Sequence, residues 1–141
     1  MKKSKRIIKY IVVHCTATKE GVDFHASDID KWHKARGFNS IGYNYVVTLN
    51  GDVELGRDVD LVPAHVAGYN SNSIGVVYVG GGDANNKPKD TRNQKQKDGL
   101  VRLLRELRKL YPNAVIQGHR DFPKVNKACP CFDAKPEYRN I

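Results

Sequence analysis

The chain has 141 residues, with 24 lysines and arginines against 15 aspartates and glutamates, and three cysteines. This length fits one domain, and a chain of about 150 residues buries roughly 70% of its unfolded surface, so folding needs no disulfide framework. A hydrophobic fraction of 40% and a charged fraction of 28% exclude a disordered or collagen-like chain. The longest apolar run, near residues 7–13, falls far short of the ~20 residues of a membrane span, so we expect no membrane insertion.

The net charge of +9 favours a polyanionic partner, which could be nucleic acid, anionic lipid or the anionic polymers of a bacterial wall. An odd number of cysteines argues against the disulfide framework of a small secreted protein. Cys129 and Cys131 also lie too close in sequence to close a useful loop. We therefore interpret the cysteines as metal ligands or as buried core residues.

The N-terminus has basic residues followed by an apolar stretch, as a signal peptide does. Lys9 interrupts the apolar stretch, however, and no small-residue cleavage site follows it. The β-branched run Ile7–His14 instead predicts a strand that is covered on both faces. We therefore expect synthesis and residence in the cytoplasm unless another protein exports or releases the chain.

A helix is predicted over residues 28–36, with Ser27 as its N-cap and acidic residues in its first turn. Trp32 and His33 share its apolar face with Ile29, and we expect Trp32 to pack against the sheet. His33 is interpreted as a helix-surface or packing residue.

A hairpin follows, with strand-like residues 43–49, a turn at Asn50-Gly51 and a return strand at 53–55. Residues 60–73 carry Pro, Gly, Asn and Ser without periodicity, which predicts a long loop, and loops of this length are usually functional. Residues 73–80 form another apolar strand.

The clearest helix is predicted at residues 94–110, where leucines repeat at helical spacing and Pro112 follows as a stop. We expect its basic side chains to face water: Lys97, Arg102, Arg105, Arg108 and Lys109. A short strand at 114–117 and a short helix from Asp133 complete the chain.

Strands that alternate with helices, together with one hairpin, indicate an α/β fold with a central mixed β-sheet flanked by helices. We expect a single domain over residues 1–141, with its core at about 7–133, and a monomer.

Two histidines, His14 and His119, end predicted strands, and strand ends are where sites gather in open α/β sheets. Cys129 follows ten residues after His119. Two imidazoles and a thiolate suit tetrahedral zinc, and three protein ligands leave one position open, as in catalytic sites. The alternative is that these histidines are hydrogen-bonded structural residues.

Eight short segments occur along the chain in this order: VHCTAT at 13–18, WHKARGF at 32–38, IGYNY at 41–45, GDVELGR at 51–57, HVAGYN at 65–70, NSIGV at 72–76, GHRD at 118–121 and KACP at 127–130. Together they resemble the zinc-dependent N-acetylmuramoyl-L-alanine amidases of the phage T7 lysozyme type, which are related to peptidoglycan recognition proteins. The resemblance runs from about residue 7 to residue 133.

The resemblance implies one zinc ion bound by His14, His119 and Cys129, with Tyr43 and Lys127 at the catalytic centre. The substrate it implies is bacterial peptidoglycan, cut at the amide between N-acetylmuramic acid and L-alanine. Lysine suits an oxyanion, and a phenol of pKa ~10 is a poor general base unless a metal shifts it.

The family also places His65 beside the substrate cleft, together with Asn72 and Ser73 as substrate-binding residues. The alternatives are a solvated loop histidine at position 65, and a role for Asn72 and Ser73 in fixing the backbone of the loop.

Cys131 stands where the T7-type enzyme has a serine, which is the main departure from the family pattern. In an extended segment it would point the same way as Cys129 and could approach the metal or oxidise with Cys129. We predict Cys129 as the ligand and Cys131 as a spectator. Cys15, adjacent to His14, faces the opposite side of its strand and is predicted to be core.

The first hypothesis is therefore a zinc amidase that degrades peptidoglycan, as phage endolysins do. The alternative is a non-catalytic peptidoglycan-binding module, which typically lacks a zinc ligand. A nucleic-acid-binding protein is disfavoured, because no aromatic interleaving or base-reading motif accompanies the basic helix face.

Overall fold

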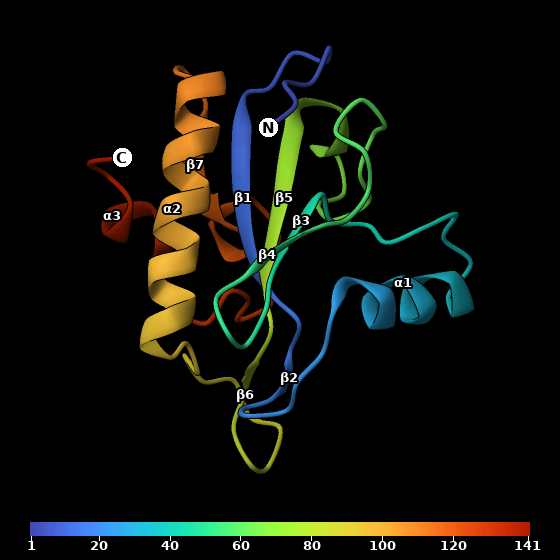
Figure 1. Ribbon diagram of the computed structural model, residues 1–141, viewed down its shortest axis with the longest axis vertical. Helices are drawn as coiled ribbons and strands as arrows, with labels where there is room; N and C mark the ends of the chain where they lie inside the picture. Colours follow the sequence, from blue (N-terminus) through green and yellow to red (C-terminus); the bar gives the residue numbers. More distant parts are fainter.

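A mixed five-stranded sheet forms the centre of the molecule, in a computed structural model that describes residues 1–141 (Figure 1). Its strands are β1 (Tyr10–Cys15), β3 (Tyr45–Val47), β4 (Val53–Leu55), β5 (Ser73–Tyr78) and β7 (Val115–Gly118). They lie in the order β4-β3-β5-β1-β7. β1 is parallel to β5 and β7, β3 is parallel to β5, and β4 is antiparallel to β3. The predicted mixed α/β fold is confirmed.

The remaining elements are α1 (Ala26–Ala35), α2 (Gln94–Leu110), α3 (Ala134–Glu137), the 3-10 turns η1 (Asn70–Asn72) and η2 (His119–Asp121), and a two-stranded sheet of β2 (Thr18–Lys19) and β6 (Gly81–Gly82). The bounds predicted for α2 are confirmed, and so is the Asn50-Gly51 hairpin between β3 and β4. No helix of the structure is long and apolar enough to cross a membrane.

The helix α2 covers one face of the sheet. Its leucines are buried against alternate residues of β1, so Ile11, Val13 and Cys15 point towards α2. Successive side chains of a strand point to opposite faces of the sheet, so every second residue of β1 faces α2. The core position predicted for Cys15 is confirmed.

The other face of the sheet is covered by α1 and by the loop that precedes β5, so α1 and α2 lie on opposite sides in Figure 1. Val12 packs there with Val66 of this loop and with Phe122. His14, two residues after Val12, points to the same side. The alternation of β1 therefore sends His14 away from the main core and towards the loops.

The first strand begins at Tyr10, so the prediction of a strand from Ile7 is wrong at its start. Tyr10 pairs with Ser73, the first residue of β5, and with Val115, the first residue of β7. Ile7 therefore extends past both neighbouring strands and is 79% exposed. Its β-branched side chain favours a strand, but no partner strand reaches it.

The first helix begins at Ala26 with His25 as N-cap, so the prediction of Ser27 as N-cap is wrong. The Glu54 carboxylate accepts a hydrogen bond from the Ala26 N–H at 2.8 Å and contacts the His25 ring at 2.8 Å. Because Glu54 lies on β4, a tertiary contact sets this helix start.

Two side chains take positions that differ from the sequence-based expectation. Trp32 does not pack against the sheet, because α1 buries Ile29 and His33 instead. The Trp32 ring makes an edge contact with the Phe24 ring, and Trp32 is 36% exposed. Arg108 does not face water: its guanidinium donates to backbone carbonyls of the chain beyond α2, including Ala114.

Candidate metal centre and cleft

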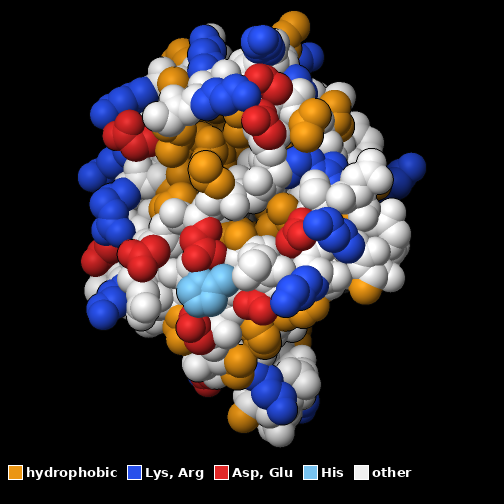
Figure 2. Space-filling view, turned by 45° about the vertical axis from the view of Figure 1, so that its right-hand side comes forward, with side chains coloured by type: hydrophobic (Ala, Val, Ile, Leu, Met, Phe, Trp, Pro, Cys, Tyr) orange, Lys and Arg blue, Asp and Glu red, His pale blue; other side chains and the backbone are white.

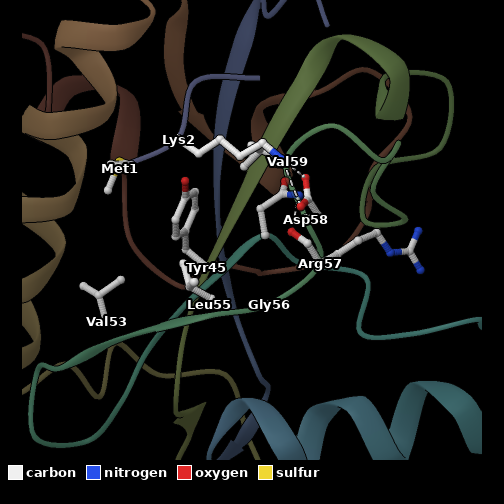
Figure 3. A pocket seen from close by; sticks show the side chains of 10 residues that line it. Met1, Lys2, Tyr45, Val53, Leu55, Gly56, Arg57, Asp58 and Val59 are labelled. Carbon is white, nitrogen blue, oxygen red and sulfur yellow. Dashed lines mark hydrogen bonds and ion pairs between the residues drawn. The ribbon is translucent and has the colours of Figure 1, made fainter. Parts of the chain in front are cut away.

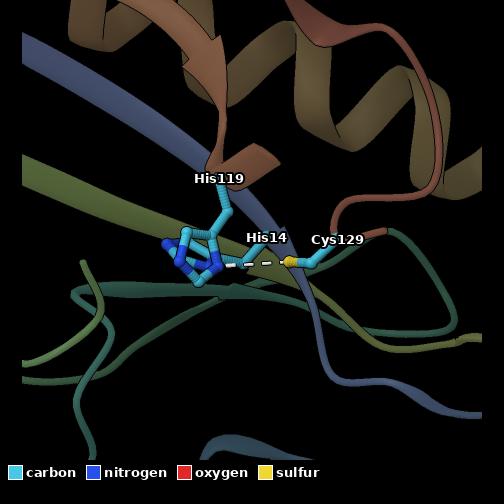
Figure 4. Close-up of side chains that lie close together, drawn as sticks. All are labelled: His14, His119 and Cys129. Carbon is cyan, nitrogen blue, oxygen red and sulfur yellow. Dashed lines mark hydrogen bonds between the residues drawn. The ribbon is translucent and has the colours of Figure 1, made fainter. Parts of the chain in front are cut away.

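His14, His119 and Cys129 converge at one edge of the sheet (Figure 4). The parallel pairing of β1 with β7 sets Val13 beside Gly118, so each strand delivers its histidine at the same edge. The two imidazole centroids are 4.7 Å apart. The register between β1 and β7 thus brings together two candidate metal ligands that are far apart in sequence.

The segment after η2 brings Cys129 to the histidines. The Arg120 N–H donates to the Cys129 carbonyl at 2.9 Å, and the Tyr78 hydroxyl donates to the Pro130 carbonyl at 2.7 Å. A Cβ at position 118 would lie 2.7 Å from Pro130 Cδ, so glycine is required for this close approach. Sheet and turn together fix the thiol.

The geometry of this triad fits a zinc ion. One ligand atom from each residue lies within 4.8 Å of the others, and His14 Nδ1 is 3.7 Å from Cys129 Sγ. Tetrahedral zinc with bonds of about 2.05 Å to nitrogen and about 2.3 Å to sulfur requires a nitrogen–sulfur separation of about 3.6 Å. The triad has the donor chemistry and the spacing that zinc requires.

The protonation states also suit a metal. His14 is 1% exposed, and burial, with the adjacent histidines and Lys127, holds its pKa well below the ordinary value. Hydrogen bonds from the thiol and the N–H of Cys15 lower the pKa of Cys129. Both shifts favour the neutral imidazole and the thiolate, which are the forms that bind metal.

A cleft of about 440 Å³ opens over the triad. Tyr43 and Lys127, the two residues predicted for the catalytic centre, both line it. The Tyr43 ring lies 5.0 Å from the His14 ring, and burial raises the pKa of its phenol, which therefore stays protonated at neutral pH. Lys127 is exposed at the cleft rim.

The three residues predicted to bind substrate lie in two different places. His65 lines the cleft, where one ring nitrogen contacts His14 and the other contacts Ser73. Ser73 is fully buried, and neither Ser73 nor Asn72 is part of the cleft wall.

Comparison with known proteins decides the family. The sequence profile described as N-acetylmuramoyl-L-alanine amidase matches residues 4–132. The chain belongs to this amidase family. It is 46% identical over 121 residues to the endolysin of Enterobacteria phage K11, covering 86% of this chain and 79% of that protein. It is 41% identical over 125 residues to the endolysin of Escherichia phage T7, covering 89% and 82%.

Solved structures agree with the sequence relatives. The N-acetylmuramoyl-L-alanine amidase LysC from Clostridium intestinale superposes with a TM-score of 0.77 at 25% identity, covering 98% of this chain and 87% of that one. The chain is thus an N-acetylmuramoyl-L-alanine amidase, and the function predicted from the ordered segments is confirmed.

The amidase cleft includes residues to which the sequence assigned no site role. They are His33, Arg36, Phe38 and Asn70, among others. The first three lie within the WHKARGF segment and Asn70 lies within HVAGYN, so these family segments could have indicated a site role. Helical periodicity alone indicated a surface or packing role for His33.

The thiol of Cys131, which we predicted to be a spectator, points away from the cleft. Its backbone has φ +70°, so the segment is not extended, and its Sγ lies 3.8 Å from Cys15 Sγ and 3.4 Å from the Gly81 carbonyl. The local turn therefore separates Cys131 from the triad, and Cys129 alone joins the histidines.

A second hollow of about 350 Å³ lies along β4, away from the triad (Figure 3). Met1, Val53 and Leu55 give it an apolar lining, and apolar side chains gather in a patch on the face drawn in Figure 2. Asp58, its one carboxylate, pairs with Lys2 at 3.0 Å. The hollow holds no cluster of metal ligands, so the amidase chemistry belongs to the cleft over the triad.

Proposed function

We propose that the amidase uses one zinc ion, held by His14, His119 and Cys129, to cut the amide between the lactyl group of N-acetylmuramic acid and L-alanine. The observation that carries this proposal is the triad itself, with its ligand atoms within 4.8 Å at the floor of an open cleft. Held by these three residues, a zinc ion would supply a water of lowered pKa near neutral pH and a positive charge to polarise the carbonyl of the scissile amide.

The roles proposed for Tyr43 and Lys127 follow from their protonation and position. A protonated phenol beside His14 donates a hydrogen bond, so Tyr43 orients the attacking water or the scissile carbonyl. The Lys127 ammonium, at the rim of the same cleft, stabilises the oxyanion that develops as the amide is attacked.

The open side of the cleft suits a polymeric substrate. The triad uses three protein groups and lies in a cleft, which leaves room for a substrate group, as in catalytic and not structural zinc sites. The net charge of +9 attracts the chain to anionic wall polymers. We therefore propose a role in degrading the bacterial wall, like that of the endolysins it resembles.

Digestion of purified peptidoglycan tests the reaction. Zinc-loaded protein is expected to release free L-alanyl amino termini, and a chelator is expected to abolish the release. His119→Ala is the negative control: it removes one proposed zinc ligand at a half-buried position, and we expect it to release no L-alanyl termini. Release of reducing sugar ends instead would indicate a glycosidase, and binding without release would favour the non-catalytic peptidoglycan-binding alternative.

A further inference from the structure

His65 has both ring nitrogens engaged within the protein. Its Nδ1 lies 2.7 Å from His14 Nε2, and its Nε2 lies 2.8 Å from Ser73 Oγ. His14 Nδ1, the other nitrogen of that ring, faces Cys129 Sγ at 3.7 Å. The three side chains Ser73, His65 and His14 therefore form one line that ends at the metal centre.

The direction of the hydrogen bonds in this line follows from the metal-facing atom. With His14 Nδ1 free of its proton for the metal, the neutral ring carries its proton on Nε2. This N–H donates a hydrogen bond to His65 Nδ1. His65 then carries its own proton on Nε2, and this N–H donates a hydrogen bond to Ser73 Oγ. Each ring is thus held in one tautomer.

Contacts with the loop and the sheet also hold the backbone of His65 and leave room for its ring. The Asn70 side-chain oxygen accepts hydrogen bonds from the backbone N–H groups of His65 and Val66, at 2.9 and 2.8 Å. On β5, a Cβ at position 75 would lie 3.0 Å from His65 Nδ1, so Gly75 leaves the space that the ring occupies. Loop and sheet together hold the ring against His14.

The geometry points to His65 as a positioning residue that orients His14 for zinc, with Ser73 holding His65 in place. This role differs from the substrate contact that the family resemblance implied for both residues. It rests on the proposed zinc site. An outer partner of a ligating histidine fixes its tautomer and ring orientation, and losing such a partner typically costs about 10–100-fold in metal affinity.

Zinc affinity, measured by competition with a chromophoric chelator, tests this role without using the amidase reaction. His65→Leu removes the acceptor, and we expect zinc to bind about 10–100-fold more weakly. His65→Asn places an oxygen near the Nδ1 position and is expected to restore most of the affinity. Ser73→Ala should weaken binding in the same direction but less. His25→Asn, at a partly exposed histidine outside the cleft that contacts Glu54 and Asp23, is the matched control.

Cobalt substitution gives a second readout, because the visible spectrum of Co²⁺ reports the geometry of its ligands. The spectrum is expected to change in His65→Leu and to match the wild type in His25→Asn, with folding checked by circular dichroism of the metal-free proteins. Unchanged zinc affinity and an unchanged cobalt spectrum in His65→Leu, with a raised KM for peptidoglycan, would overturn the inference and restore substrate contact. Weaker zinc binding in that variant, beside a wild type that releases no L-alanyl termini, would refute the proposed reaction alone.

Discussion

Replacing Cys129 and, separately, Cys131 by serine decides which thiol binds zinc. In the structure only Cys129 Sγ lies near His14 Nδ1, at 3.7 Å, while Cys131 turns towards Cys15. We expect Cys129→Ser to lose the response to zinc and Cys131→Ser to keep it. The two variants make the same chemical change two residues apart, so each is the control for the other.

The size of the effect follows from linkage between binding and folding. Zinc at about 100 times its dissociation constant stabilises the folded state by RT ln(1 + 100), about 2.7 kcal/mol. An unfolding entropy of about 2.1 cal/mol/K per residue over 141 residues gives ~0.3 kcal/mol/K, so zinc should raise the wild-type melting temperature by about 9 °C. Since an outer partner alone is worth about 10–100-fold, losing a ligand should cost ~100-fold or more, which leaves about 0.4 kcal/mol and a shift of about 1 °C.

The assay is thermal unfolding of each protein with zinc and with a chelator, followed by circular dichroism. Cys131→Ser should keep the shift of about 9 °C. A full zinc shift in Cys129→Ser, or its loss in Cys131→Ser alone, would refute the ligand set inferred from the cleft geometry.

Three further predictions concern catalysis, pH and the core. Lys127→Ala should lower kcat about 10²–10³-fold on peptidoglycan with zinc affinity unchanged, whereas an unchanged kcat would remove Lys127 from the reaction. Burial lowers the pKa of His65 to about 3 and also lowers that of His33, so the unfolded chain binds protons that the folded chain does not. Urea unfolding of the metal-free protein should therefore show stability falling as the pH drops below about 6.5, and constant stability down to pH 5 would contradict this. Leu104→Ala, at a fully buried position on the sheet-facing side of α2, should reduce the free energy of unfolding by about 2–5 kcal/mol, and a loss below 1 kcal/mol would mean that this core repacks.

Much of the architecture was predictable because local patterns agree with the tertiary structure. The leucine period of α2 and the Asn50-Gly51 turn specify their elements almost alone, and both are confirmed. The start of α1 was not predictable, because Glu54 of β4, which is distant in sequence, accepts the hydrogen bond of the first helical N–H at Ala26. Ile7 likewise has a strand-forming side chain, but the lengths of β5 and β7 leave it without a partner.

The amino-acid sequence alone determined which residue types are present for the chemistry, and the order of its short segments determined the amidase family. Spacing along the chain did not determine that His14 and His119 meet, because this depends on the parallel register of β1 with β7. The tertiary structure alone turned His65 towards His14 and Ser73, and it separated Cys131 from the triad by a local turn. The physical reason is the same in each case: side-chain direction depends on strand register and backbone dihedrals, which segments distant in sequence settle only when they pack together.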